Sequence, residues 1–275
     1  MRSLPTPTNL LMAFLIVTAS AGAAPSAPPT DVLADVGGRN LHLVVRSGAG
    51  PVAVVFESGG AADASAWSTV PDLVASSVDG PVVTYDRAGL GTSDLGPEDL
   101  SPWQEVADLD RALESVGVRR FILVGHSYGG LLALYNAESH PDRVVGLVLV
   151  DPMNPAFVNA MGLDWMQATV PDITEPTTPF DHVVVRMKTT FGELVHRTAD
   201  GLPSIDVPII VITAGRLWWD DPTADAAWRQ SHEALAAASH RELVVATESE
   251  HDIPGSEPEL VVNAIQRVLE RIDRE

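Results

Sequence analysis

The hydrophobic positions of this chain fall into short apolar runs separated by longer segments with helical periodicity. Seven runs rich in Val, Ile and Leu predict β-strands. Most of them are apolar at every position rather than at alternate positions, as expected for strands covered on both faces. The predicted strands cover about residues 41–47, 51–57, 81–86, 121–125, 144–151, 208–213 and 242–247.

Helical patterns lie between these runs. Four helices are predicted, at about residues 102–116, 127–139, 224–238 and 258–272. Regular alternation of buried strands and helices is typical of a parallel sheet with helices on its faces. The sequence therefore predicts an α/β fold, with a mainly parallel central sheet wrapped by helices.

One segment interrupts this alternation. Residues 153–206 have no convincing strand of the main sheet, but they are rich in Met, Phe and Trp, among them Met153, Phe157 and Trp165. We interpret this segment as a small, mostly helical lid, inserted after the strand that ends at Asp151. The predicted domain, including the lid, covers residues 32–275.

The N-terminus has the layout of a secretory signal peptide. Arg2 gives a positive start, Leu10–Val17 forms a short apolar core, and small residues at 21–24 offer a cleavage site. We expect a signal peptide at residues 1–24, a flexible lead-in at 25–31 and a secreted or periplasmic protein. The apolar run is too short for a stable membrane span; an uncleaved anchor or a misassigned start is the alternative.

The charge and composition exclude several classes of partner and chemistry. The net charge is −20 and the only lysine is Lys188, so the chain repels phosphate backbones and we expect no nucleic-acid partner. There are no cysteines, which excludes disulfides, thiolate nucleophiles and Cys-ligated metals.

A Gly-x-Ser-x-Gly pattern stands between a predicted strand and a predicted helix. It reads Gly125-His126-Ser127-Tyr128-Gly129. A serine in such a tight strand-to-helix turn points its oxygen out of the sheet, and the start of the helix presents free N–H groups to a developing oxyanion. Ser127 is therefore the candidate nucleophile.

With this motif the chain resembles the α/β-hydrolase family, in its serine esterase and lipase branch. The stretch "YDRAGLGTSD", residues 85–94, is similar to the family's D-x-R-G-x-G-x-S-D loop, with Ala88 in place of the first glycine. The stretch "VVFESGG", residues 54–60, matches a strand and turn that normally end in His-Gly, here Ser58-Gly59. The resemblance covers about residues 32–272.

The resemblance implies two backbone donors for an oxyanion hole. One is the N–H of Tyr128, directly after the nucleophile, and the other is the N–H of Gly60, in the turn after the strand. Gly60 has a simpler explanation as well, since a tight turn alone can require glycine.

His251 is the candidate general base, because it lies between the last predicted strand and the last helix, where family members place their histidine. His126 lies inside the serine motif, where a structural role is usual. We expect surface or loop positions for the remaining histidines, which show no ligand-like spacing, so neither a metal site nor a cofactor is predicted.

The acid that should orient His251 is left open among three aspartates. Most family members place it after the later strand, where Trp218 stands at the usual position and Asp220 and Asp221 follow slightly late. Some relatives place it after the earlier strand, which here ends at Asp151. We favour Asp151, with Asp220 as the fallback and Asp221 or no acid as the remaining possibilities.

These residues predict acyl chemistry on a small-molecule ester. A serine nucleophile separates this chain from the dehalogenase and epoxide hydrolase branches, which use aspartate there. The apolar lid, with Trp218 and Trp219, favours a hydrophobic acyl or aromatic substrate, although both tryptophans could instead anchor the lid. The alternatives are an acyltransferase, a thioesterase or an aminopeptidase on the same residues, or a non-catalytic binding protein of this fold.

Overall fold

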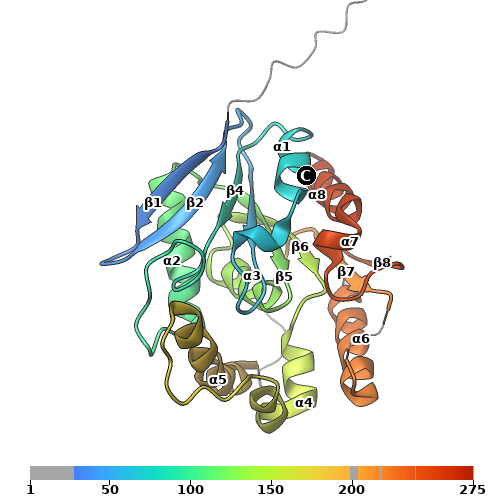
Figure 1. Cartoon of the computed structure of the whole chain (residues 1–275). Coiled ribbons are helices and arrows are strands. Elements are labelled where there is room, and N and C mark those ends of the chain that lie inside the picture. The colour runs from blue at the N-terminus through green and yellow to red at the C-terminus, as the bar shows by residue number, and fades with distance from the viewer. Residues whose placement is uncertain (1–27, 199–203, 217–218, 239, 275) are drawn as a thin grey trace, which may run out of the picture.

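A computed structural model of the chain describes residues 28–198, 204–216, 219–238 and 240–274. The predicted signal peptide therefore lies outside the described residues, as does Trp218. Figure 1 shows a twisted central sheet with helices on both sides and the C-terminal helix beside the first one.

The sheet has eight strands in the order β1-β2-β4-β3-β5-β6-β7-β8. The first two strands run antiparallel to their neighbours, and the strands from β3 onward pair in parallel. The mainly parallel α/β sheet predicted from the sequence is thus present. The strands are β1 (Thr30–Asp35), β2 (Asn40–Arg46), β3 (Ala53–Glu57), β4 (Val82–Tyr85), β5 (Phe121–His126), β6 (Val144–Val150), β7 (Ile209–Ala214) and β8 (Arg241–Ala246).

Strand β1 was missed by the sequence analysis. Thr30 and Asp31, assigned there to the flexible lead-in, pair with Val45 and Val44 of β2. Most of β1 is exposed, so it has no continuous apolar run that would have marked it as a strand.

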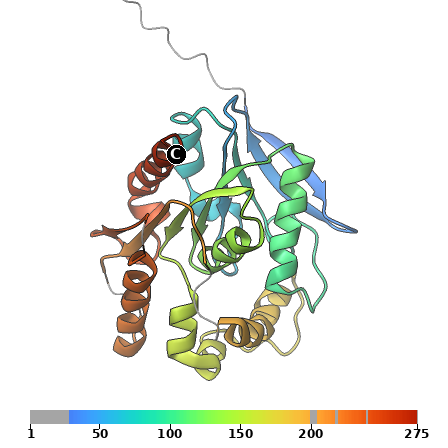
Figure 2. The ribbon, with the colours of Figure 1, turned by 180° about the vertical axis from the view of Figure 1, so that it is seen from behind.

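Helices cover both faces of the sheet (Figure 2). Several of them start at a side-chain cap; α2, for example, has a capping box made by Ser101 and Gln104, with Pro102 in its first turn. The helices are α1 (Val70–Ala75), α2 (Pro102–Ser115), α3 (Tyr128–Ser139), α4 (Pro155–Ala168), α5 (Pro179–Thr198), α6 (Pro222–Ala236), α7 (Ile253–Ser256) and α8 (Pro258–Ile272), with a short 3₁₀ turn at Ala64–Trp67.

Alternate strand residues feed two separate cores. Val55 of β3 belongs to the core beneath α2, α3 and α6, whereas its neighbours Val54 and Phe56 belong to the core beneath α1 and α8. This is why the strand sequences are apolar at every position. Because β3 and β5 to β8 run parallel, their carboxyl ends all open at one edge of the sheet.

The segment interpreted as a lid contains α4 and α5, with no strand among its described residues. These helices form a third apolar cluster with the outer side of α3 and with α6, which includes Leu131, Phe157, Phe191 and Trp228. The cluster lies at the carboxyl edge of the sheet, next to the start of α3.

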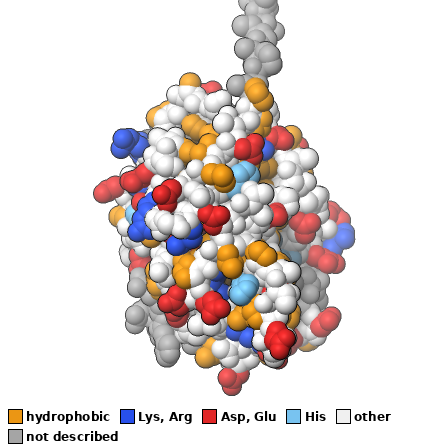
Figure 3. Space-filling view, turned by 60° about the vertical axis from the view of Figure 1, so that its left-hand side comes forward, with side chains coloured by type: hydrophobic (Ala, Val, Ile, Leu, Met, Phe, Trp, Pro, Cys, Tyr) orange, Lys and Arg blue, Asp and Glu red, His pale blue; other side chains and the backbone are white. Residues whose placement is uncertain are grey.

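The exposed surface agrees with the strong negative charge of the chain. On the face in Figure 3, acidic side chains are spread over the surface among basic and hydrophobic ones. In the part of the chain that the structure describes, no helix is both long enough and apolar enough to cross a membrane.

Candidate active site

Ser127 occupies a sharp turn between β5 and α3. Its backbone angles, φ 54° and ψ −123°, lie in a region that L-residues rarely adopt. Its N–H donates to Val150 O at 3.1 Å, and its carbonyl accepts from Gly130 and Met153. Bonds from both neighbouring segments therefore hold the strained turn, and they leave Ser127 half-buried at the carboxyl edge of the sheet.

Two glycines, Gly125 and Gly129, let backbones approach closely around this turn, and Gly59 packs against the serine itself. A Cβ on Gly129 would lie 2.3 Å from Glu57 O and 2.4 Å from Ser58 O, and one on Gly125 would lie 2.5 Å from Gly129 O. A Cβ on Gly59 would lie 3.4 Å from Ser127 Cβ. The turn after β3 is thus packed directly against Ser127 and the first turn of α3.

The structure pairs His251 with Asp151. His251 Nδ1 lies 2.7 Å from Asp151 Oδ2, and the other carboxylate oxygen accepts a 2.9 Å hydrogen bond from Ala214 N–H at the end of β7. Asp151 is fully buried, whereas a quarter of the His251 side chain is exposed. The remaining ring nitrogen of His251, Nε2, is thereby the one available for proton transfer.

The surroundings keep Asp151 ionised. Burial alone would raise its pKa, but the hydrogen bond with His251, the rings of His232 and His251 and the N–H of Ala214 together lower the pKa. An ionised Asp151 accepts from His251 Nδ1–H and so fixes the tautomer of that ring.

The other candidate acids lie elsewhere. Asp220 is exposed. Asp221 caps α6 by accepting from Thr223 N–H, and its second oxygen accepts from Trp165 Nε1 at 3.3 Å. Asp221 therefore serves the start of a helix.

Two further histidines contribute contacts that the sequence analysis did not assign. His126 Nε2 donates to the carbonyl of His251 at 2.9 Å, and the two rings lie 4.5 Å apart. His232 was expected at the surface or in a loop, and this is wrong. It is fully buried on α6, where it donates from Nε2 to Pro152 O, and its Nδ1 lies 3.8 Å from Asp151.

Burial disfavours the protonated form of both rings. It lowers the pKa of His126 to about 4, with a further contribution from the nearby His251, and it also lowers the pKa of His232. The hydrogen bond of His126 braces the loop of His251, and that of His232 braces Pro152, next to Asp151.

Of the two expected oxyanion donors, Tyr128 directly follows Ser127 in the chain, and Gly60 follows Gly59, which packs against Ser127. Tyr128 is the first residue of α3, so its N–H has no partner within the helix. Gly60 lies in the turn after β3, beneath helix α5, where Met187 Cε is 2.9 Å from the place that a Cβ on Gly60 would take.

Aromatic rings of α4, α6 and the loop after β7 form a continuous cluster that reaches His251. Trp219 contacts Phe157 and Trp165 of α4, with the Trp165 ring centroid 5.0 Å away. Trp228 of α6 contacts Phe157 at 4.6 Å and His251 at 5.9 Å. Trp219 therefore joins its loop to α4.

Comparison with known proteins places the whole arrangement in one family. Residues 54–264 match the sequence model described as "Alpha/beta hydrolase family". The chain belongs to the α/β hydrolase family. The fold and the family resemblance predicted from the sequence are both confirmed, and hydrolase chemistry is the general activity of this family.

The proteins similar to this α/β hydrolase carry names that indicate different activities. It is 24% identical to the uncharacterized protein YqjL of Bacillus subtilis over 236 residues, 85% of this chain and 89% of YqjL. It is 35% identical to the proline iminopeptidase of Neisseria gonorrhoeae, over only 30% of this chain and 28% of that enzyme. The solved structure of the epoxide hydrolase CorEH superimposes with a TM-score of 0.63 at 17% identity, over 89% of this chain and 99% of CorEH; at that identity the likeness concerns the fold.

Among the described residues, no group of His, Asp or Glu is arranged to hold a metal ion. The described residues bring together a serine at a strained turn and a histidine paired with a buried carboxylate, and the N–H of Tyr128 follows the serine directly.

Proposed function

We propose that this α/β hydrolase is a serine hydrolase that cleaves carboxylic esters through an acyl-enzyme on Ser127. The 2.7 Å contact between Asp151 and His251 carries the proposal. It supplies a base of defined tautomer next to the serine turn, because the ring of His251 lies against that of His126, the residue before Ser127.

The reaction follows from these positions. Ser127 Oγ attacks the ester carbonyl while its proton passes to His251 Nε2, and the N–H groups of Tyr128 and Gly60 bind the oxyanion. As the tetrahedral intermediate collapses, the C–O bond to the alcohol breaks and His251 returns the proton to the leaving oxygen. Asp151 stays ionised and stabilises the imidazolium throughout.

The second half of the reaction repeats these roles with water. His251 takes a proton from a water molecule, whose oxygen attacks the acyl carbonyl. Ser127 leaves with the proton held by His251, and the carboxylic acid is released. The sequence of steps needs no cofactor.

The aromatic cluster and Met187 support a hydrophobic acyl or aromatic group in the substrate. Trp228 contacts His251 directly, and Met187 lies over Gly60, so the walls near the two reacting centres are apolar. Apolar walls favour substrates whose acyl chain loses water on binding. We also propose that Trp218 or Trp219 contacts the substrate directly.

Labelling with a fluorophosphonate tests the proposal. The probe phosphonylates a serine, with loss of fluoride, only where a base activates the serine, so we expect one equivalent on Ser127 and none in Ser127→Ala. A series of p-nitrophenyl esters from acetate to decanoate should then be hydrolysed, with kcat/KM rising with chain length. A folded wild-type protein that takes up no label is a binding protein rather than a serine hydrolase.

An aminopeptidase is the second candidate, and the match to a proline iminopeptidase favours it. The same serine, histidine and backbone donors would cleave an amide. L-Proline β-naphthylamide, assayed beside p-nitrophenyl butyrate, separates the two: an aminopeptidase has the higher kcat/KM on the naphthylamide, and an esterase has it on the ester.

A further inference from the structure

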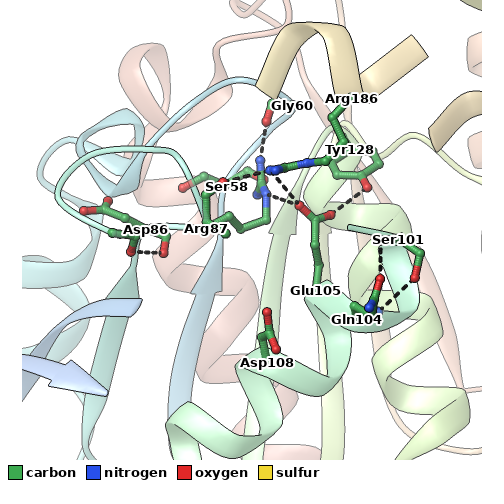
Figure 4. A network of polar contacts seen from close by, with 12 residues as sticks. Ser58, Gly60, Asp86, Arg87, Ser101, Gln104, Glu105, Asp108, Tyr128 and Arg186 are labelled. Atoms are coloured by element: carbon green, nitrogen blue, oxygen red, sulfur yellow. Dashed lines mark hydrogen bonds and ion pairs between the residues drawn. The ribbon is translucent and has the colours of Figure 1, made fainter. Parts of the chain in front are cut away.

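A single buried arginine holds the turn that follows β3. Arg87, just after β4, is 4% exposed, and its guanidinium donates to the carbonyls of Ser58, Gly59 and Gly60. Figure 4 shows the guanidinium beneath this turn, between Ser58, Gly60 and Glu105. The carbonyl of Gly59 also accepts from Ala62 N–H, at 3.3 Å.

The orientation of these carbonyls also sets the orientation of the N–H groups. In a planar trans peptide, C=O and N–H point in opposite directions. Because the carbonyl of Gly59 points to Arg87, the N–H of Gly60 points away from Arg87. The turn packs against the serine motif at Gly59, where an added Cβ would lie 3.2 Å from His126 Nδ1 and 3.4 Å from Ser127 Cβ.

A buried guanidinium needs compensating charge, and two glutamates supply it. Glu57 accepts from Arg87 at 2.6 Å and also from the hydroxyl of Tyr85, and Glu105 lies 3.9 Å away. Although burial would lower the pKa of Arg87, these carboxylates raise it, so Arg87 stays charged. Its bonds to the carbonyls are therefore charge-assisted.

The same network reaches the other side of Ser127. Glu105 accepts from the hydroxyl of Tyr128 at 2.9 Å, and the guanidinium of Arg87 lies 5.4 Å from the centre of the Tyr128 ring. Both residues expected to bind the oxyanion are thus tied to Arg87, one through its backbone and one through its side chain (Figure 4).

We propose that Arg87 is a positioning residue for the oxyanion hole, which fixes the turn at residues 58–60 so that the N–H of Gly60 faces the acyl oxygen bound at Ser127. The role rests on the proposed function, since it presumes that an oxyanion forms there. Arg87 itself does not touch the substrate. It acts by fixing the donor before the reaction, which spares the enzyme the cost of reorganising the turn.

Arg186 of α5 offers a matched control. It is 5% exposed, it also lies 3.9 Å from Glu105, and it donates to the carbonyl of Ala88 rather than to the turn. Arg87→Lys and Arg186→Lys both keep a positive charge in the same buried network. Only Arg87→Lys replaces a guanidinium that donates to three carbonyls of the turn by a single ammonium group.

Steady-state kinetics on p-nitrophenyl butyrate and the affinity of butylboronic acid test the role. The boronate forms an anionic tetrahedral adduct on the serine and so reports on the oxyanion hole. In Arg87→Lys we expect kcat to fall about 100-fold, as for a small misplacement of a reacting group, with KM within threefold and the boronate affinity reduced in parallel. In Arg186→Lys kcat and the boronate affinity should stay within threefold of wild type.

Amide hydrogen exchange measured without ligand tests the same point independently of activity. The amide hydrogens of the peptide that contains residues 58–62 should exchange faster in Arg87→Lys than in wild type. In Arg186→Lys their exchange rate should equal that of wild type. If Arg87→Lys does not fold, the double variant Arg87→Gln/Glu57→Gln, which removes both charges of the closest pair, takes its place. The proposal would be overturned if the Arg87 variant had the kcat and the exchange rate of wild type. It would also be overturned if the Arg87 and Arg186 variants lost kcat to the same extent. A wild-type protein that takes up no fluorophosphonate refutes the serine hydrolase function instead, while exchange at the turn still decides the role of Arg87.

Discussion

Asp151 and His251 are separated by 100 residues in the sequence, yet Asp151 Oδ2 and His251 Nδ1 lie 2.7 Å apart. Asp151 directly follows strand β6, one strand before β7, the strand that precedes the alternative candidate Asp220. Asp151 is fully buried, and its second oxygen is held by Ala214 N–H at the end of β7. The later strand thus contributes a backbone donor that orients the carboxylate of the earlier one.

This geometry predicts the effect of Asp151→Asn. The asparagine oxygen would keep the bond from Ala214 N–H, which turns its NH₂ group toward His251. His251 Nδ1 would then have to accept this hydrogen bond, so the ring proton would sit on Nε2. A protonated Nε2 cannot take the proton of Ser127. We expect kcat on p-nitrophenyl butyrate to fall by about 10⁴-fold, with the far-ultraviolet circular dichroism spectrum unchanged.

Asp220→Asn and Asp221→Asn are the controls for this substitution. Asp220 is exposed and Asp221 caps α6, and asparagine caps helices as well as aspartate does. Both variants should keep kcat within threefold of wild type. A large loss in Asp220→Asn together with an active Asp151→Asn would show that the acid lies after β7.

Gly129→Ala should push the serine turn and the turn after β3 apart, because it adds a methyl group where the two backbones touch. Its new methyl group would meet two backbone carbonyls, Glu57 O at 2.3 Å and Ser58 O at 2.4 Å, and backbone cannot rotate out of the way as a side chain can. We expect urea denaturation to show a loss of about 1–3 kcal/mol in the free energy of unfolding. Because the two turns carry the expected oxyanion donors, kcat should also fall at least about tenfold.

Gly192→Ala is the matched control for that prediction. Gly192 is also helical, on α5, and a Cβ there would meet nothing within 4 Å. The same substitution should stabilise the protein by about 0.5–1 kcal/mol, since glycine within a helix is less favourable than alanine by that amount. A Gly129→Ala protein as stable and active as wild type would mean that the close approach at Glu57 O is not needed.

The sequence identified the parts of this protein that depend on local patterns. Apolar runs marked seven of the eight strands, and the last helix was predicted at residues 258–272, as observed for α8. The serine turn was also visible, because it needs a strand, small residues and a helix in immediate succession. Strand β1 escaped, since only its pairing with β2 defines it.

The sequence favoured Asp151 as the partner of His251 but left Asp220 open, because both follow buried strands. The 2.7 Å distance between Asp151 and His251 depends on the fold and is not contained in either stretch. The bond from Ala214 N–H to Asp151 and the buried position of His232 beside it depend on how β6, β7 and α6 meet. The network of Arg87 is of the same kind, because Glu57 and Glu105 come from separate elements.

His126 should make the stability of the protein fall in mild acid. Burial lowers its folded pKa to about 4 from an ordinary value of 6.5. Between these two pH values the unfolded chain binds a proton that the folded protein does not, so the free energy of unfolding decreases as the pH falls from 6.5 to 4. At about 1.4 kcal/mol for each pKa unit, His126 contributes a loss of about 3 kcal/mol over that range.

Urea denaturation of wild type and His126→Gln at several pH values between 4 and 7 measures this contribution. The glutamine amide nitrogen reaches about as far as His Nε2, so it can donate to the carbonyl of His251, which His126 Nε2 reaches at 2.9 Å, but it does not titrate. The variant should therefore lose less stability on acidification than wild type. A decline caused by His232, whose pKa burial also lowers, should remain in both proteins. If the free energy of unfolding falls in parallel with pH for the two proteins, His126 is protonated equally in the folded and unfolded states. It would then brace the loop of His251 without destabilising the protein in acid.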